Sequence, residues 1–199
     1  EICACLVGSE MCIRDRDTIL TEFGKVDILI NNAGGGTSMP ILEMTDEAYF
    51  KDINTDLLGL FKCLREFGKV MVKQGYGRII NIASILGLVG ENGVPVAGYQ
   101  SAKGGVVNLT RCAATELATT GVTVNAICPG FFPSESNGPA EMEAMDSFIR
   151  VNTPMDRPGL PSELDKVGEL EGAAVFLASD EASYVTGAIL PVDGGWTCH

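Results

Sequence analysis

The sequence has a single histidine, His199 at its last position, and its seven cysteines include no Cys-x-x-Cys pair. Structural zinc sites are built from closely spaced cysteine and histidine ligands. Cys3, Cys5 and Cys12 lie close together, but no fourth ligand is spaced to complete a site, so we expect free thiols and no metal. An odd number of cysteines without paired modules suits a reducing compartment better than a disulfide framework.

Long apolar runs and an excess of basic residues are also lacking. No apolar segment approaches the about 20 residues that span a bilayer, and no basic segment at the N-terminus leads into an apolar one. Lysine and arginine total 14 against 26 aspartates and glutamates, a formal net charge of -12. Nucleic acids and anionic membranes bind basic surfaces. We therefore expect a cytoplasmic protein whose partner is a small molecule, not nucleic acid or a membrane.

The 199 residues, 46% of them hydrophobic, are enough for one domain with a sizeable core. From residue 17 onward, short β-branched apolar runs alternate with longer helical patterns. This alternation predicts an α/β fold with a parallel sheet covered by helices on both faces. The expected strands are 26–32, 77–84, 122–128 and 187–195, and the expected helices are 45–73, 98–119, 139–150 and 168–179.

The first of these helices has the clearest pattern. Thr45 can cap its N-terminus, and Asp46 and Glu47 then fall in the positive first turn. Apolar residues recur at helical spacing through to about Lys73, which predicts one buried face. The residues expected on this face are Phe50, Ile53, Leu57, Phe61 and Leu64.

Polar or glycine-rich loops follow three of the predicted strands. They are Asn31 to Gly36, Ser84 to Gly90, and the segment from Pro129 onward. In a parallel sheet these loops share one edge, where ligands bind. We therefore expect the functional site at this edge.

The stretch GYQSAKGG follows the second loop and places Tyr99 and Lys103 four residues apart on a helix, so both side chains lie on one face. A tyrosine with a pKa of about 10 is a poor base at neutral pH, but a nearby ammonium stabilises its phenolate. The pair can therefore form a general acid/base in which Lys103 lowers the pKa of Tyr99. The alternative is that Tyr99 only packs and Lys103 is solvated.

Other residues near this edge have both functional and structural interpretations. Gly104 and Gly105 weaken a helix, which favours a close approach by another segment over a merely poor helix. Ser84 can donate a hydrogen bond to a substrate oxygen or serve as a cap or turn residue. Asn54 lies among apolar helix positions, where a buried amide needs a partner.

Taken together, these motifs resemble the short-chain dehydrogenase/reductase family, classical type, from about Leu20 to Thr197. Each motif is weak alone, but their combination in this order is specific. They are NNAG (31–34), INTDLLGLF (53–61), IINIAS (79–84), YQSAK (99–103), VNAICPG (124–130) and VTGAILPVDGG (185–195).

The resemblance implies a Rossmann-like, doubly wound parallel sheet that binds NAD or NADP and interconverts an alcohol and a carbonyl. Tyr99 would be the catalytic acid/base, and Lys103 would lower its pKa and bind the nicotinamide ribose. Ser84 would orient the substrate oxygen, and Asn54 would hold a water in the proton relay. The implied cofactor-binding residues are Asn31, Asn32, Ala33, Gly34, Tyr99, Lys103, Pro129, Gly130 and Ser134.

The closing segment, which includes NTPMDRPG and GAAVFLAS, is similar to members that act on sugar acids and polyols, such as gluconate 5-dehydrogenases. The resemblance also implies a homo-oligomer, a tetramer or a dimer, formed through the two long helices.

The chain departs from the family at its start. The usual Gly-x-x-x-Gly-x-Gly turn is not found, so we expect a sheet that lacks the first βαβ cofactor-binding half. Residues 1–16 match no family element and look like an artefactual junction, which leaves 17–199 as the C-terminal part of one domain. The alternative to an active oxidoreductase is an inactive fragment or an interaction module, with an exposed strand edge at 26–32. A third reading is a protein that binds another ligand, with Tyr99 and Lys103 as bystanders.

Overall fold

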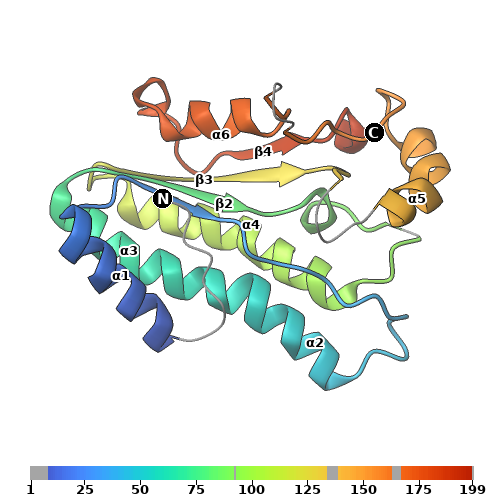
Figure 1. Ribbon diagram of the computed structural model, residues 1–199, viewed down its shortest axis with the longest axis horizontal. Coiled ribbons are helices and arrows are strands. Elements are labelled where there is room, and N and C mark those ends of the chain that lie inside the picture. The colour runs from blue at the N-terminus through green and yellow to red at the C-terminus, as the bar shows by residue number, and fades with distance from the viewer. Residues whose placement is uncertain (1–8, 92, 134–138, 163–166, 199) are drawn as a thin grey trace.

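The computed structural model describes residues 9–91, 93–133, 139–162 and 167–198 (Figure 1). Its centre is a parallel sheet of four strands in the order β1-β2-β3-β4. Every strand lies in or next to a segment for which the sequence predicts one, so the predicted α/β fold is confirmed. The strands are β1 (Ile28–Asn31), β2 (Gly77–Ile82), β3 (Val122–Pro129) and β4 (Ile189–Val192).

The two central strands are buried along almost their whole length, as continuous apolar runs predict. On one face, Ile79 and Val124 pack against α3 (Leu60–Gln74) and α4 (Ala97–Leu117), with Phe67 and Met71 of α3 in the same core. On the other face, Ile80 and Ile127 pack against Leu177 of α6 (Glu171–Ala178). Figure 1 shows the sheet between these helices, with α3 and α4 on one side and α6 on the other.

The predicted helix 45–73 is interrupted. Thr45 caps α2 (Asp46–Asp52) by accepting a hydrogen bond from the Ala48 amide at 3.2 Å, as predicted. A π-helical segment, η1 (Ile53–Gly59), then separates α2 from α3. A π-turn holds more residues than an α-turn, so positions beyond it leave the 3.6-residue register.

The prediction for the buried face was wrong in part. Leu64 is buried, but Phe50 is 56% and Phe61 37% exposed. Two carboxylates, those of Asp52 and Asp56, lie buried on the inner side instead, with relative exposures of 1% and 0%. The apolar pattern alone did not predict that acidic residues would be buried on this face.

The structure contains a helix that the sequence did not predict, α1 (Ser9–Phe23). It packs on α3, where Arg16 donates a hydrogen bond to Glu66 at 2.8 Å. The predicted boundary after residue 16 falls inside this helix, and the division of the chain there stays a prediction.

The remaining predicted helices are present as α4, α5 (Pro139–Asn152) and α6. The described residues also include three short 3-10 turns: η2 (Ile85–Gly87), η3 (Asp180–Ala182) and η4 (Trp196–Cys198). In the sheet that the structure describes, β1 and β4 are the two edge strands. Among the helices of the described residues, none is long and apolar enough to cross a membrane.

Candidate active site

The loops after β1 and β2 meet the N-terminal half of α4, as the sequence predicts. A side chain at Gly36 would collide with Tyr99, since an added Cβ would lie 2.9 Å from the Tyr99 Cβ. An added Cβ at Gly87 would lie 2.6 Å from the backbone carbon of Lys103. These two glycines allow both loops to approach the helix closely, and the site forms between them.

Tyr99 and Lys103 lie on the same side of α4, and the Lys103 Nζ is 5.3 Å from the centre of the Tyr99 ring. Tyr99 is half-buried and Lys103 only 3% exposed. The ammonium donates a hydrogen bond to the Ile82 carbonyl at 2.9 Å and lies 3.2 Å from Oδ1 of Asp56. Lys103 is therefore not a solvated surface lysine, so this part of the alternative interpretation, in which Tyr99 only packs and Lys103 is solvated, is excluded.

Ser84 follows β2 and plays a cap role: its hydroxyl accepts a hydrogen bond from the Leu86 amide at 3.1 Å and starts η2. The same hydroxyl lies near the Tyr99 phenol and lowers the pKa of that group. The cap and the contact with the site are thus compatible, and the structure brings Ser84, Tyr99 and Lys103 together.

The electrostatics differ from the expectation that Lys103 lowers the pKa of Tyr99. Burial raises the pKa of Tyr99, Ser84 opposes this shift, and the Asp56 carboxylate adds to it. The pKa of Lys103 is lowered by burial, an effect that Asp56 opposes. The physical reason for the difference is that the lysine ammonium faces a carboxylate, so its charge is largely neutralised before it reaches the phenol.

Sequence reasoning missed Asp56. Its carboxylate accepts hydrogen bonds from the Gly35 amide at 3.2 and 3.3 Å and pairs with Lys103. Burial raises the pKa of this carboxyl, and Lys103 lowers it. The signal was present in the sequence, because Asp52 and Asp56 lie one turn apart on a helix otherwise expected to turn an apolar face inward.

Asn54, the residue predicted to hold a relay water, lies on η1 and is half-buried. Among the described residues, Asp56 is the residue of η1 that accepts hydrogen bonds at the site and pairs with Lys103. The role of Asn54 stays a prediction.

The predicted cofactor residues after β1 divide into two groups. Asn31 is buried, and its amide donates to the Asn81 side chain at 2.9 Å, which in turn donates to Thr110 at 3.0 Å. This chain ties β1, β2 and α4 together. Asn32, Ala33 and Gly34 are exposed at the carboxyl end of β1, where a ligand can reach their backbone.

At the end of β3, the Gly130 amide donates to the Val192 carbonyl at 2.9 Å. A side chain at Gly130 would crowd the Asp193 backbone, because an added Cβ would lie 2.9 Å from its Cα. Pro129 and Gly130 are both half-buried and end the strand at the predicted edge. Ser134, the last predicted cofactor residue, lies outside the described residues.

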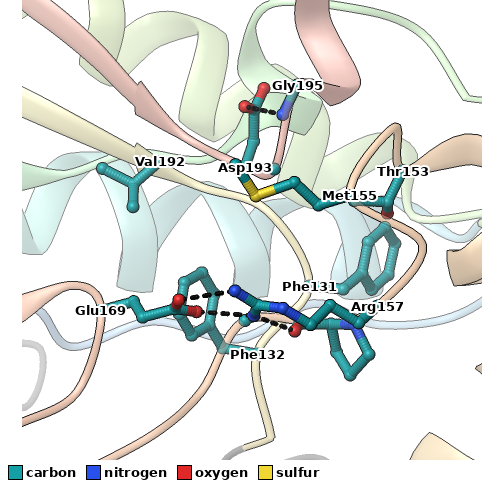
Figure 2. Close-up of a pocket in the computed structure, with 12 residues that line it drawn as sticks. Phe131, Phe132, Thr153, Met155, Arg157, Glu169, Val192, Asp193 and Gly195 are labelled. Atoms are coloured by element: carbon teal, nitrogen blue, oxygen red, sulfur yellow. Dashed lines mark hydrogen bonds and ion pairs between the residues drawn. The ribbon is translucent and has the colours of Figure 1, made fainter.

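A cavity of about 340 Å³ lies beyond Gly130, and the sequence did not predict it (Figure 2). Phe131 and Phe132 line it together with Met155 and the segment from Val192 to Gly195. An ion pair at its wall joins Arg157 and Glu169 through two hydrogen bonds of 2.7 and 2.8 Å. Figure 2 shows this pair below Met155. Ser84, Tyr99 and Lys103 do not line the cavity.

The glycine pair in α4 has a packing function. An added Cβ at Gly105 would lie 2.7 Å from a methyl group of Leu57 in η1, and Gly104 faces the Gly87 carbonyl. The prediction that these glycines permit a close approach is confirmed: α4 is tightly packed against η1 and η2.

Comparison with known proteins supports the resemblance to the short-chain dehydrogenase/reductase family that the sequence motifs indicate. Residues 10–197 match the family model described as enoyl-(acyl carrier protein) reductase. A 3-oxoacyl-[acyl-carrier-protein] reductase of Synechocystis is 40% identical over 179 residues, which are 89% of this chain and 68% of the relative. The chain belongs to the short-chain dehydrogenase/reductase family. It is therefore a member of a family of oxidoreductases.

Further members of the family differ in the substrates that their names state. An acetoacetyl-CoA reductase of Shinella zoogloeoides is 36% identical and matches 94% of this chain and 74% of its own length. Among solved structures, a putative gluconate dehydrogenase from Agrobacterium tumefaciens matches with a TM-score of 0.86 and 37% identity, covering 95% of this chain and 72% of that one. A gluconate 5-dehydrogenase from Burkholderia cenocepacia, solved with NADP and tartrate, has a TM-score of 0.87 and 31% identity, covering 96% and 72%. The Rossmann-like fold is thus shown, while the substrate differs between relatives.

Proposed function

We propose that this site interconverts an alcohol and a carbonyl with NAD or NADP as the hydride carrier. The observation that carries the proposal is the convergence of Ser84, Tyr99 and Lys103 at the carboxyl ends of the strands, in a chain of this family. Tyr99 passes a proton to or from the substrate oxygen, and the Ser84 hydroxyl orients that oxygen. Lys103 holds its ammonium beside the phenol, and Asn54 holds a water of the proton relay.

The residues present fit the nicotinamide end of such a cofactor. The exposed backbone of Asn32 to Gly34 lies beside Lys103, and an added Cβ at Gly34 would lie 3.0 Å from the Lys103 Nζ. Only glycine leaves this loop close to the ammonium. Pro129, Gly130 and Ser134 complete the proposed set, and the bound cofactor supplies or accepts the hydride.

For the substrate we propose a sugar acid or a polyol, as the closing segment suggests. Support comes from the likeness to the two gluconate dehydrogenase structures. A 3-oxoacyl thioester is the second candidate, supported by the identity to the Synechocystis reductase. Its acyl chain suits the apolar residues packed around Tyr99, which include Val94, Leu86, Phe131 and Trp196.

The test is a substrate panel run with each cofactor: sugar acids, polyols, hydroxysteroids and 3-oxoacyl thioesters. We expect turnover that Tyr99→Phe reduces by at least about 100-fold, because the phenol is the proton donor and acceptor. Tyr184→Phe is the matched control, since Tyr184 is fully exposed on the surface. Activity confined to thioesters or hydroxysteroids would refute the sugar-acid assignment.

The same experiment separates the other readings of the chain. A folded chain that binds no nicotinamide cofactor would be an inactive fragment or an interaction module. Binding together with turnover that Tyr99→Phe leaves unchanged would make Tyr99 and Lys103 bystanders. Cofactor binding is measured by titration of the intrinsic fluorescence, because Trp196 lies in the cluster that contains Tyr99.

We also propose that the protein is a homo-oligomer, a dimer or a tetramer, formed through the long helices. Phe50 on α2 and Phe61 and Val72 on α3 are exposed apolar residues on these helices. Apolar side chains of this size on a helix surface are typical of association sites. Light scattering of the purified chain gives its mass in solution and tests this proposal directly.

A further inference from the structure

Two carboxylates hold the loop that follows β1. Asp52 accepts hydrogen bonds from the Thr37 amide at 3.0 Å and from its hydroxyl at 2.9 Å. One turn later, Asp56 accepts two from the Gly35 amide. Both acids are buried. The two do not have the same partners, however, because only Asp56 also reaches a charged side chain of α4.

That charged side chain is Lys103, and its surroundings are well defined. Of its three N–H donors, one is taken by the Ile82 carbonyl and one points to Asp56, at 2.9 and 3.2 Å. Both members of the ion pair are at most 4% exposed at the side chain, so water screens the pair little. The ammonium is thereby fixed between β2 and η1, with its Nζ 5.3 Å from the centre of the Tyr99 ring.

The ion pair and the groups around it come from four elements and from the residue that follows β2. Asp52 lies on α2, Asp56 on η1, Tyr99 and Lys103 on α4, and the Cys128 thiol on β3. Ser84 approaches from the end of β2. Burial raises the pKa of Cys128 to about 11, so this thiol is neutral at physiological pH. Lys103 is therefore the one positive charge among these groups, and Asp56 is the acid in contact with it.

We propose that Asp56 is a positioning residue of the proton-transfer site: its buried carboxylate fixes the Lys103 ammonium and neutralises it toward the Tyr99 phenol. The proposal rests on the proposed function, because it assigns to Asp56 the tuning of that same acid/base. Tyr99 then works beside an ion pair and not beside a lone cation. A phenolate gains less stabilisation in this arrangement, so the working pH of the site is set higher than a tyrosine and lysine alone would give.

The first test measures Tyr99 and needs neither cofactor nor substrate. The Cζ signal of carbon-labelled tyrosine is followed by NMR as a function of pH, with Tyr99→Phe used to assign it. We expect Asp56→Asn to lower the pKa of Tyr99 by roughly one unit, since the freed ammonium then stabilises the phenolate. Asp52→Asn is the matched control, an equally buried acid that does not contact Lys103, and it should change the pKa far less.

A folded Asp56→Asn chain with an unchanged or raised Tyr99 pKa would overturn the proposal. An equal shift in Asp52→Asn would also overturn it, because a general loss of negative charge would then be the cause. In the unmodified chain, the Tyr99 signal should show a small step where the Asp56 carboxyl titrates. Absence of that step would contradict the proposal even if Asp56→Asn fails to fold.

The second test uses turnover. In alcohol oxidation, where Tyr99 acts as the base, Asp56→Asn should move the acid limb of the kcat/KM profile to lower pH by roughly the same one unit. A merely structural role would reduce activity without moving this limb. If the chain shows no turnover at all, the proposed function fails, while the NMR titration still decides the role of Asp56.

Discussion

Ser84 combines two roles in one hydroxyl. The Ser84 hydroxyl oxygen accepts a hydrogen bond from the Leu86 amide, which leaves the hydroxyl proton free to donate. The same hydroxyl lies near the Tyr99 phenol. A hydrogen bond of this kind stabilises a phenolate more than a phenol, which is why Ser84 lowers the pKa of Tyr99. The local start of η2 and the pKa of Tyr99 therefore depend on the same atom.

We predict that Ser84→Ala raises the pKa of Tyr99 further and lowers kcat by about 100-fold, because a preorganised hydrogen-bond donor is lost. Ser84→Thr keeps the hydroxyl and should retain most of both properties. The tyrosine NMR titration and steady-state kinetics measure the two effects. A kcat in Ser84→Ala equal to that of the unmodified chain would limit Ser84 to its capping role.

At the scale of elements, the site depends on how closely η2 and η1 approach α4. Gly87 of η2 lies against backbone atoms of Lys103, which have no rotamer freedom and yield only if the helix moves. Gly105 lies against the end of the Leu57 side chain, which can rotate. The contact of η2 is thus the more rigid of the two.

Gly87→Ala should destabilise the fold by about 1 to 3 kcal/mol, the usual cost of overpacking, and should displace Lys103. Gly90→Ala is the control three residues further on, where an added Cβ meets nothing within 4 Å. Urea unfolding of both variants gives the two free energies. Equal stability of Gly87→Ala and Gly90→Ala would show that η2 does not pack on α4 as the structure has it.

At the scale of the whole molecule, α1 packs mainly on α3, and a buried carboxylate contributes to that contact. The Glu66 side chain is 4% exposed and accepts from Arg16 and Arg65 at 2.8 Å and from Lys69 at 3.1 Å. The hydrogen bond from Arg65 is the main reason that the pKa of Glu66 is lowered; burial opposes it, and Lys69 adds to it.

Because its folded pKa is depressed, Glu66 stabilises the protein fully above its unfolded pKa of about 4.3 and loses this contribution as pH falls through the lower folded value. We predict that Glu66→Gln lowers the free energy of unfolding by about 1 to 2 kcal/mol at neutral pH. The difference from the unmodified chain should vanish at acid pH. Urea unfolding at several pH values measures it, with Glu22→Gln, an exposed acid on α1, as the control.

A pH-independent difference would mean that the Glu66 side chain acts through its shape and not through its charge. The contact between Arg16 and Glu66 also concerns the predicted boundary after residue 16. Arg16 lies within the segment that the sequence reading set apart as non-family, yet in the structure it reaches a buried residue of α3.

The sequence by itself determined the parallel α/β fold and the edge of the sheet at which Ser84, Tyr99 and Lys103 lie. Strands buried on both faces are continuous apolar runs, and a parallel order brings their carboxyl ends together, so local patterns contain this information. The same holds for Tyr99 and Lys103, whose shared helix face follows from their spacing. The Thr45 cap was predictable for the same reason.

Only the tertiary structure decided what surrounds the two residues. The π-helical segment η1 shifts the helix register, so Phe61 beyond it is exposed and Asp56 within it is buried. A periodicity of 3.6 residues cannot predict such a change, because it depends on packing against α4. The sequence predicted an ammonium beside Tyr99 but not the carboxylate that pairs with it, for the same physical reason. Asp56 lies 47 positions before Lys103 in the chain and becomes its partner only in the folded protein.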